Sequence, residues 1–160
     1  MLWISALLII RRTKLRNVIA YIVVFFSLAM VIRLTLVERS YIHDICLIPF
    51  VTLNNVGGLR SLLMNVALFI PLGLSLPFVL PDRVKRKVLV STVIGIILSI
   101  CIEASQYIFS LGRCETDDVI MNTLGTLIGA TSYTLYKLLT SWIDKKKVLR
   151  DSKEHDGPHK

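Results

Sequence analysis

The chain has 160 residues, of which 54% are hydrophobic, and its formal net charge is +8. Its mean hydropathy is +0.65. Soluble domains of this size alternate apolar and polar faces and are seldom this apolar, so the composition excludes an ordinary soluble enzyme or binding module. The basic excess does not indicate nucleic-acid binding, because the basic residues stand in three clusters beside apolar segments, where anionic lipid headgroups account for them.

The first ten residues, MLWISALLII, are too few to cross a membrane, which takes about 20 apolar residues. We expect them to form a short interfacial segment held by Trp3. Four longer apolar windows follow, at 18–37, 62–80, 88–109 and 119–141. Each can cross a hydrocarbon core of about 30 Å as a helix, and none alternates in polarity as a transmembrane strand does. The sequence therefore predicts an all-α membrane protein with four transmembrane helices.

The basic residues set the orientation of these helices. They gather at 11–16, at 83–87 and at 145–160, whereas the connections 38–61 and 110–118 carry few. The positive-inside rule then places both termini in the cytoplasm and these two connections outside. The last sixteen residues are polar and lack periodicity, so we expect a membrane domain over 1–144 and a disordered basic tail over 145–160.

Several polar residues fall near the outer ends of the predicted helices. Glu103 lies six residues before the end of the third window, which puts it roughly 9 Å below the outer end of that helix. Gln106 shares its helical face, and Asn122 shares a face with Asp118 at the start of the fourth helix. The predicted polar cluster consists of Asn65, Glu103, Gln106, Arg113, Asp118 and Asn122. Arg33, near the outer end of the first helix, either completes this cluster or snorkels to the interface.

Small residues continue these faces inward. A carboxylate exposed to lipid would cost several kcal/mol or stay protonated, so we expect the polar groups to face one another. Small side chains let helices approach closely enough for that. They are Ser91, Gly95 and Ser99 on the third helix and Gly125 and Gly129 on the fourth. We expect the third and fourth helices to pack against each other along these two stripes.

Simpler interpretations remain open for some of these residues. The amides can serve only as interhelical hydrogen-bonding groups. The stretch RCETDD can be a solvated turn in which Asp117 or Asp118 caps the fourth helix. Cys46 and Cys114 are both predicted outside, where they form a disulfide or remain two thiols, and Cys101 is a small packing residue.

The chemistry of the cluster is not fixed by a motif. Two carboxylates on neighbouring helices can share a proton, hold a divalent cation or bind a cationic group. The sequence contains no recognisable nucleophile motif, zinc motif or phosphate-binding glycine loop. We therefore assign no catalytic residue, metal or cofactor.

The order of several short motifs resembles the VanZ-like family of small membrane proteins. The motifs are LIPF at 47–50, NVALFIPLG at 65–73, E-x-x-Q at 103–106 and DDVIMNTLGTLIG at 117–129, and the resemblance covers about 47–136. The family's characteristic polar positions fall on Asn65, Glu103, Gln106, Asp118 and Asn122, with Pro49 and Phe50 before the second helix. Arg113 matches a basic position, Gly125 and Gly129 match small residues, and Glu115 stands where Asp is common.

The resemblance implies a multi-pass protein of the bacterial plasma membrane. The family is associated with lowered susceptibility to teicoplanin. Our leading expectation is a cell-envelope protein that lowers susceptibility to teicoplanin-like lipoglycopeptides through the outward-facing polar site. Its expected partners are membrane lipids and either an amphiphilic glycopeptide or a lipid-linked cell-wall precursor. An alternative is a membrane enzyme that acts on a lipid or a lipid-linked cell-wall precursor, with Glu103 and Asp118 as its acid–base pair. A third is a structural subunit of a larger assembly.

Overall fold

The computed structural model describes residues 13–37, 42–51 and 56–155, so the expected interfacial segment lies outside the described residues. All four predicted helical windows are helical. The elements in chain order are α2 (Thr13–Ile32), the π-helical turn η1 (Arg33–Val37), β1 (Ile42–Cys46), α3 (Gly58–Val79), α4 (Lys87–Ile108), β2 (Leu111–Glu115) and α5 (Thr116–His155).

Three helical segments of the described chain are long and apolar enough to cross a membrane. They are Leu15–Leu36, Gly58–Val79 and Lys87–Ile108, each of 22 residues. The first half of α5 falls short of that hydropathy because Asn122, Thr123 and Thr126 interrupt its apolar residues. The fourth crossing therefore stays a prediction.

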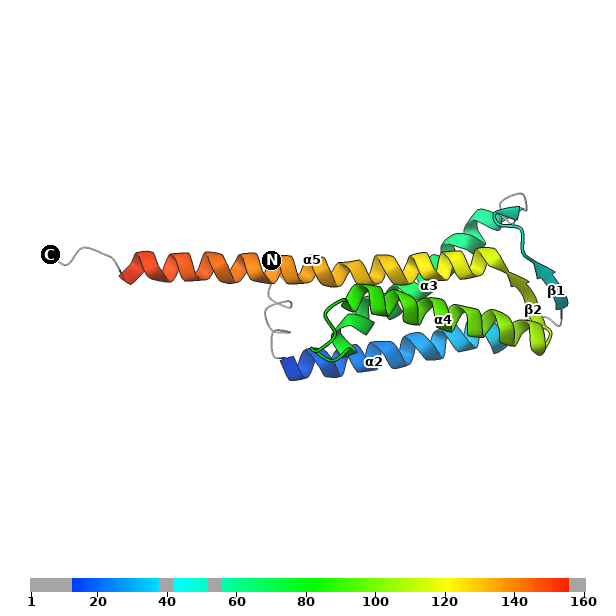
Figure 1. The fold of residues 1–160 in the computed structure, drawn as a ribbon, viewed down its shortest axis with the longest axis horizontal. Coiled ribbons are helices and arrows are strands. Elements are labelled where there is room, and N and C mark those ends of the chain that lie inside the picture. The colour runs from blue at the N-terminus through cyan, green and yellow to red at the C-terminus, as the bar shows by residue number, and fades with distance from the viewer. Residues whose placement is uncertain (1–12, 38–41, 52–55, 156–160) are drawn as a thin grey trace.

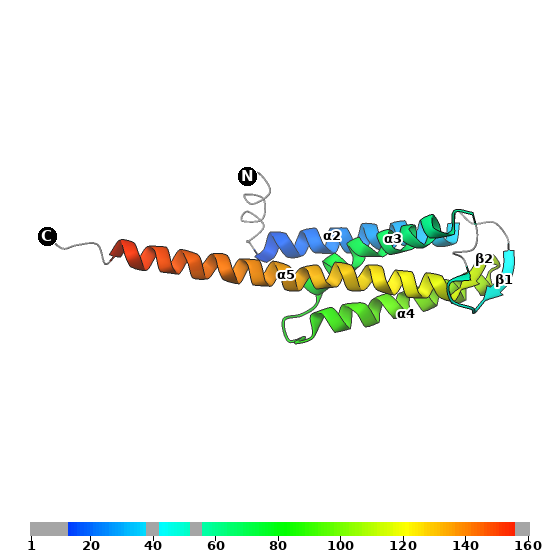
Figure 2. The same cartoon turned by 90° about the horizontal axis from the view of Figure 1, so that it is seen from above.

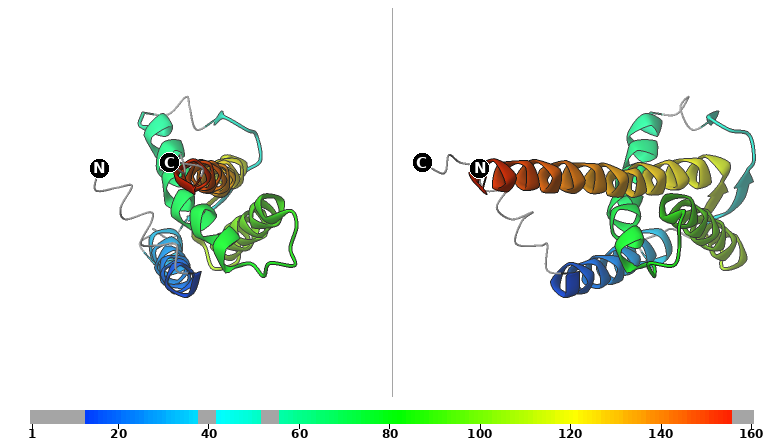
Figure 3. Two further views of the ribbon diagram at one scale, coloured as in Figure 1. Left: turned by 90° about the vertical axis from the view of Figure 1, so that its left-hand side faces the viewer. Right: turned by 60° about the vertical axis from the view of Figure 1, so that its left-hand side comes forward.

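The helices form an antiparallel bundle. α2 and α4 run toward the end of the molecule that carries β1 and β2, and α3 and α5 run away from it (Figures 1 and 2). α3 packs against both α2 and α5, and α4 packs mainly against α5. The end-on view shows α3 crossing obliquely between α2 and α5 (Figure 3).

A two-stranded ribbon joins the two connections that were predicted to lie outside. β1 and β2 pair in parallel, from Ile42 opposite Leu111 to Cys46 opposite Glu115. The strands are parallel because they continue α2 and α4, which run in the same direction, and α3 and α4 supply the long crossover that parallel strands need. The chain is mostly helical, in agreement with the all-α prediction, and this short ribbon in the two connections is the part of the fold that the prediction missed.

The last helix is longer than expected. α5 continues without a break from Thr116 to His155 and extends past the rest of the bundle (Figure 1). The prediction of a disordered tail from residue 145 is wrong over 145–155, because a helix that is already nucleated extends readily through helix formers such as Lys, Leu and Arg. The boundary predicted between 144 and 145 thus falls inside one helix.

The side chains divide into a small interior and a large apolar exterior. The buried core joins three helices through Val31, Phe69, Leu72, Leu76 and Ile102. Large apolar side chains point outward, and Phe25, Phe26 and Ile97 are 67%, 65% and 56% exposed. Soluble monomers seldom expose apolar surface on this scale, so these faces suit contact with lipid.

The glycines mark where the helices approach most closely. A Cβ atom on Gly125 would lie 2.2 Å from the carbonyl oxygen of Val66, and one on Gly129 would lie 2.3 Å from that of Ile70, both on α3. A Cβ atom on Gly95 would instead meet the side chain of Thr126 on α5.

The stripe prediction is therefore only half right. The stripe of Ser91, Gly95 and Ser99 is buried, and it faces α5 as expected at Gly95 and Ser99. Gly125 and Gly129 face α3, so the expected contact between the two stripes is wrong. The reason is that α5 packs against two helices and uses adjacent sides of its surface for them.

Candidate functional site

Glu103 ties the end of α4 to the ribbon. Its side chain lies in the last turns of α4 and is buried, with 4% of its surface exposed. One carboxylate oxygen, Oε2, accepts a hydrogen bond of 3.0 Å from the backbone N–H of Glu115 in β2. The Glu103 carboxylate, which interrupts the apolar sequence of α4, thus points inward, toward the chain that follows α4.

Asp118 ties the start of α5 to α3. It is buried, and its Oδ1 accepts a hydrogen bond of 2.6 Å from Nδ2 of Asn65. Asp118 lies inside the first turn of α5 rather than before it. The partial positive charge of the helix N-terminus favours a carboxylate at this place.

Asp117, considered above only as a cap, is also a structural anchor. It is buried in the same first turn of α5, and its Oδ1 accepts a hydrogen bond from the backbone N–H of Phe50. Phe50 has a positive φ of 64°, which is uncommon for a residue other than glycine. The contact holds the chain after β1 against α5.

The two predicted amides bridge helices through their NH₂ groups. Nδ2 of Asn122 donates to Oγ of Ser99 at 2.8 Å, and Nε2 of Gln106 donates to the backbone carbonyl oxygen of Thr35 at 2.8 Å. The amide oxygens of both side chains are buried and have no hydrogen-bond partner within the described part of the chain. Buried acceptors without a donor are costly, so a water or a bound donor group is expected at these oxygens.

Cys114 lies near both carboxylates. Burial raises the pKa of the Cys114 thiol, and the negative charges of Glu103 and Asp118 raise it further. Cys114 lies opposite Ile45 in the ribbon, so Cys46 is one position removed and its side chain points to the other face. Both thiols are free, which decides between the two alternatives for this pair.

Arg113 lies at the rim of the site and not inside it. Its side chain is 43% exposed, and its Nε donates to Oδ2 of Asp44 at 2.8 Å. A second guanidinium nitrogen lies 3.6 Å from Oε1 of Glu115. Arg33 is exposed as well, in η1. The structure therefore gathers Asn65, Glu103, Gln106, Asp118 and Asn122 at one end of the bundle and leaves both arginines outside the buried part.

The buried part of the site is rich in acceptors. Two carboxylates and two unpartnered amide oxygens come from α4 and α5, and Arg113 pairs with acids of the ribbon. Across the described residues, no three His, Cys, Asp or Glu side chains are arranged to hold a metal ion. Such an arrangement suits a ligand that donates hydrogen bonds or carries a positive charge.

Comparison with known proteins identifies the family of the chain. A family model described as VanZ/LLP1 matches residues 15–139. The chain belongs to the VanZ/LLP1 family. The match begins in α2 and ends in α5, so the family region includes every helix of the bundle and the whole polar site.

A relative of this family has a similar sequence. The chain is 33% identical over 94 residues to Protein VanZ of Enterococcus faecium, an alignment that covers 59% of this chain and 55% of the relative. The chain thus spans about half the length of the curated relative it matches. No solved structure matches the chain.

Sequence reasoning missed some partners of the site. Ser99 was assigned to packing only, although it accepts the hydrogen bond from Asn122. Thr126 is fully buried and donates from its hydroxyl to the backbone oxygen of Asn122, at a spacing of four residues that the sequence displays. The carbonyl group of Thr35 and the carboxylate of Asp44 carry no comparable signal in the sequence.

Proposed function

We propose that this VanZ/LLP1 family member is a multi-pass protein of the bacterial plasma membrane with four transmembrane helices and both termini in the cytoplasm. In this proposal it lowers susceptibility to teicoplanin-like lipoglycopeptides through the polar site at its outer end. The family membership and the related Protein VanZ support the class of protein.

The distribution of charge supports the orientation. The two connections with few basic residues meet in the ribbon at one end of the bundle, and the basic connection 83–87 lies at the opposite end (Figure 1). Because basic connections stay in the cytoplasm, the ribbon end faces outward.

The exposure pattern of α5 supports the fourth crossing. Asn122 and Thr126, which lower its hydropathy, are 3% and 0% exposed, whereas Leu124 and Ile128 are 41% and 44% exposed. Polar groups inside a membrane are tolerated when they face the bundle interior, so α5 presents an apolar surface to lipid despite its composition.

The observation that carries the proposed site is the pair of buried, unpartnered amide oxygens on Asn122 and Gln106, beside the carboxylates of Glu103 and Asp118. A cationic or hydrogen-bond-donating group of an amphiphile in the outer leaflet satisfies these acceptors. The carboxylates meet its charge, and the amides fix its orientation.

The test is expression of the chain in a teicoplanin-susceptible Gram-positive host, with membrane levels matched by immunoblot. Wild type should raise the teicoplanin inhibitory concentration, and Glu103→Gln and Asp118→Asn should return it toward the empty-vector value. The matched control is Asp144→Asn, the same carboxylate-to-amide change near the far end of α5, which should behave as wild type.

Two results would contradict this proposal. An unchanged teicoplanin inhibitory concentration in cells that carry the wild-type protein in the membrane would refute the proposed function. Full activity of both site variants would refute a role for the polar site and favour a structural subunit. A change in the profile of lipids or lipid-linked precursors that Glu103→Gln abolishes would instead support the enzyme alternative.

A further inference from the structure

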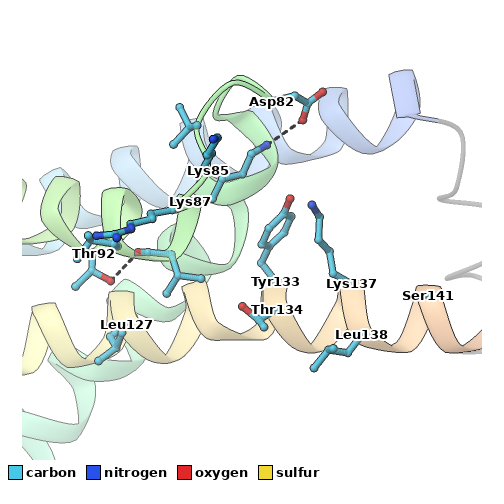
Figure 4. A pocket seen from close by; sticks show the side chains of 14 residues that line it. Asp82, Lys85, Lys87, Thr92, Leu127, Tyr133, Thr134, Lys137, Leu138 and Ser141 are labelled. Atoms are coloured by element: carbon cyan, nitrogen blue, oxygen red, sulfur yellow. Dashed lines mark hydrogen bonds and ion pairs between the residues drawn. The ribbon is translucent and has the colours of Figure 1, made fainter.

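A cavity lies at the end of the bundle opposite the polar site. It measures about 1020 Å³ and is lined by the connection between α3 and α4, the first turns of α4 and the middle of α5 (Figure 4). Four cations line it against one carboxylate; they are Lys85, Arg86, Lys87 and Lys137, and the acid is Asp82. The excess of positive charge is the first sign of an anionic ligand.

The buried lysine is already satisfied within the protein. Lys87 is 8% exposed, and its Nζ donates to the carbonyl oxygen of Leu80 at 2.8 Å and pairs with Asp82 at 3.1 Å. That pair uses the one acid of the cavity. The charges of Lys85, Arg86 and Lys137 therefore remain in excess, and all three of these side chains are exposed.

The start of α4 strengthens the positive potential. The helix has no acidic residue in its first turn, and no side chain caps it. Its first N–H groups carry partial positive charge, which adds to the charges of Lys85 and Arg86. Tyr133 faces the same space from α5, with Lys137 5.2 Å from the centre of its ring (Figure 4).

The remaining wall of the cavity is apolar. Leu89, Leu127 and Leu138 line it and are 54%, 40% and 64% exposed, so they continue the outer apolar surface of α4 and α5. A ligand of this cavity therefore meets positive charge at one end and a lipid-like surface at the other. A soluble anion such as inorganic phosphate would use only the first of these.

An adjoining cavity of about 480 Å³ shares four of the lining residues, which are Asp82, Lys87, Tyr133 and Lys137. It is also lined by Arg16 and Asn17 of α2. Buried Nε of Arg16 and buried Oδ1 of Asn17 have no hydrogen-bond partner within the described part of the chain. Unsatisfied polar atoms beside a basic cavity point to a polar group that the described residues do not supply.

We propose that this cavity binds one anionic phospholipid of the inner leaflet. Its phosphate lies between Lys85, Lys137 and the start of α4, and an acyl chain follows the apolar surface of Leu89 and Leu127. The inner-leaflet position follows from the proposed orientation, but the pairing of a basic end with an apolar wall does not depend on it. The anionic cytoplasmic surface concentrates such lipids near basic residues.

The experiment measures lipid binding to the purified full chain in detergent by native mass spectrometry and by thermal shift. The probes are phosphatidylglycerol, phosphatidylcholine and inorganic phosphate. Wild type should retain phosphatidylglycerol in preference to phosphatidylcholine. Each removed cation should weaken the binding of phosphatidylglycerol about fivefold, and the double variant Lys85→Gln, Lys137→Gln about 25-fold.

The matched control is the double variant Lys145→Gln, Lys147→Gln, which removes the same charge from exposed positions of α5 outside the cavity lining. It should bind phosphatidylglycerol as wild type does. If the double cavity variant does not fold, Lys85→Gln alone, at an exposed position of the connection, gives the fivefold test.

Three outcomes would overturn the proposal. They are equal retention of phosphatidylcholine, equal loss in the control variant, and a thermal shift with inorganic phosphate as large as that with phosphatidylglycerol. The last would assign the cavity to a soluble phosphate. Glu103→Gln should leave phosphatidylglycerol binding unchanged, so this proposal and the proposed function can fail separately.

Discussion

Gly129→Ala tests the contact between α3 and α5 most directly. The added methyl group would lie 2.3 Å from the carbonyl oxygen of Ile70 and 2.6 Å from the amide nitrogen of Leu74. Both atoms belong to the backbone of α3, and neither can rotate away as a flexible side chain can. The shorter distance falls 1.1 Å below 3.4 Å, at which ordinary van der Waals contact begins.

The size of the effect follows from this geometry. α3 and α5 must move apart locally by about 1 Å, and a gap of that size forfeits a quarter to a half of the dispersion energy of the atoms along it. Overpacking of this kind costs about 1–3 kcal/mol, so we expect a loss of about 2 kcal/mol in the free energy of unfolding. Helix propensity acts in the opposite direction, because alanine favours a helix by up to about 1 kcal/mol over glycine.

Whether Gly129→Ala lowers or raises the free energy of unfolding therefore distinguishes a close helix contact from an effect of helix propensity alone. The measurement is the unfolding of the purified protein by sodium dodecyl sulfate in mixed micelles, followed by far-ultraviolet circular dichroism. Thr131→Ala is the control, since its exposed side chain lies on the same helix and the substitution changes propensity without a clash. A Gly129→Ala protein as stable as wild type, or more stable, would refute the close approach of α3 and α5.

Two other predictions follow from the packing and the charges. Gly95→Ala should destabilise the protein less than Gly129→Ala does, because its methyl group would meet the flexible side chain of Thr126 rather than backbone. Adding Thr126→Ala to Gly95→Ala should recover part of the lost free energy of unfolding. If the losses of the two single variants simply add in the double variant, the contact is contradicted. Cys114 should react slowly with a maleimide at pH 8, because its raised pKa leaves less thiolate than a free cysteine has. Either Glu103→Gln or Asp118→Asn should lower the pKa of Cys114 and speed the reaction. Labelling rates against pH, in a chain whose other cysteines are replaced by serine, measure this, and rates unaffected by either variant would place the carboxylates away from the thiol.

The sequence predicted most of what depends on local pattern. The four helical windows follow from runs of apolar residues, and each matches a helical segment of the structure to within one residue at its end or lies inside it, the first continuing from α2 into η1. Glu103, Asp118 and Asn122 were singled out because polar groups inside apolar helices must find partners, and each is buried and hydrogen-bonded.

What the sequence did not predict depends on which helix lies beside which. Nothing in the spacing of Gly125 and Gly129 says whether α3 or α4 packs on them, since either helix can approach a stripe of small residues. The parallel ribbon arises only because α2 and α4 end at the same level and run in the same direction. The basic cavity joins residues of the connection after α3 to Lys137 on α5, which are about fifty positions apart in the chain.

The sequence alone thus determined the class of protein, the helices and the polar residues that cannot face lipid, because these follow from the free energy of transferring single segments and side chains. Only the tertiary structure decided the partner of each group, because hydrogen bonds and close backbone contacts depend on relative positions that no periodicity records. Asn65 illustrates the difference. Its polarity near the start of α3 was evident from the sequence, but its bond to Asp118 exists only because α5 begins beside it.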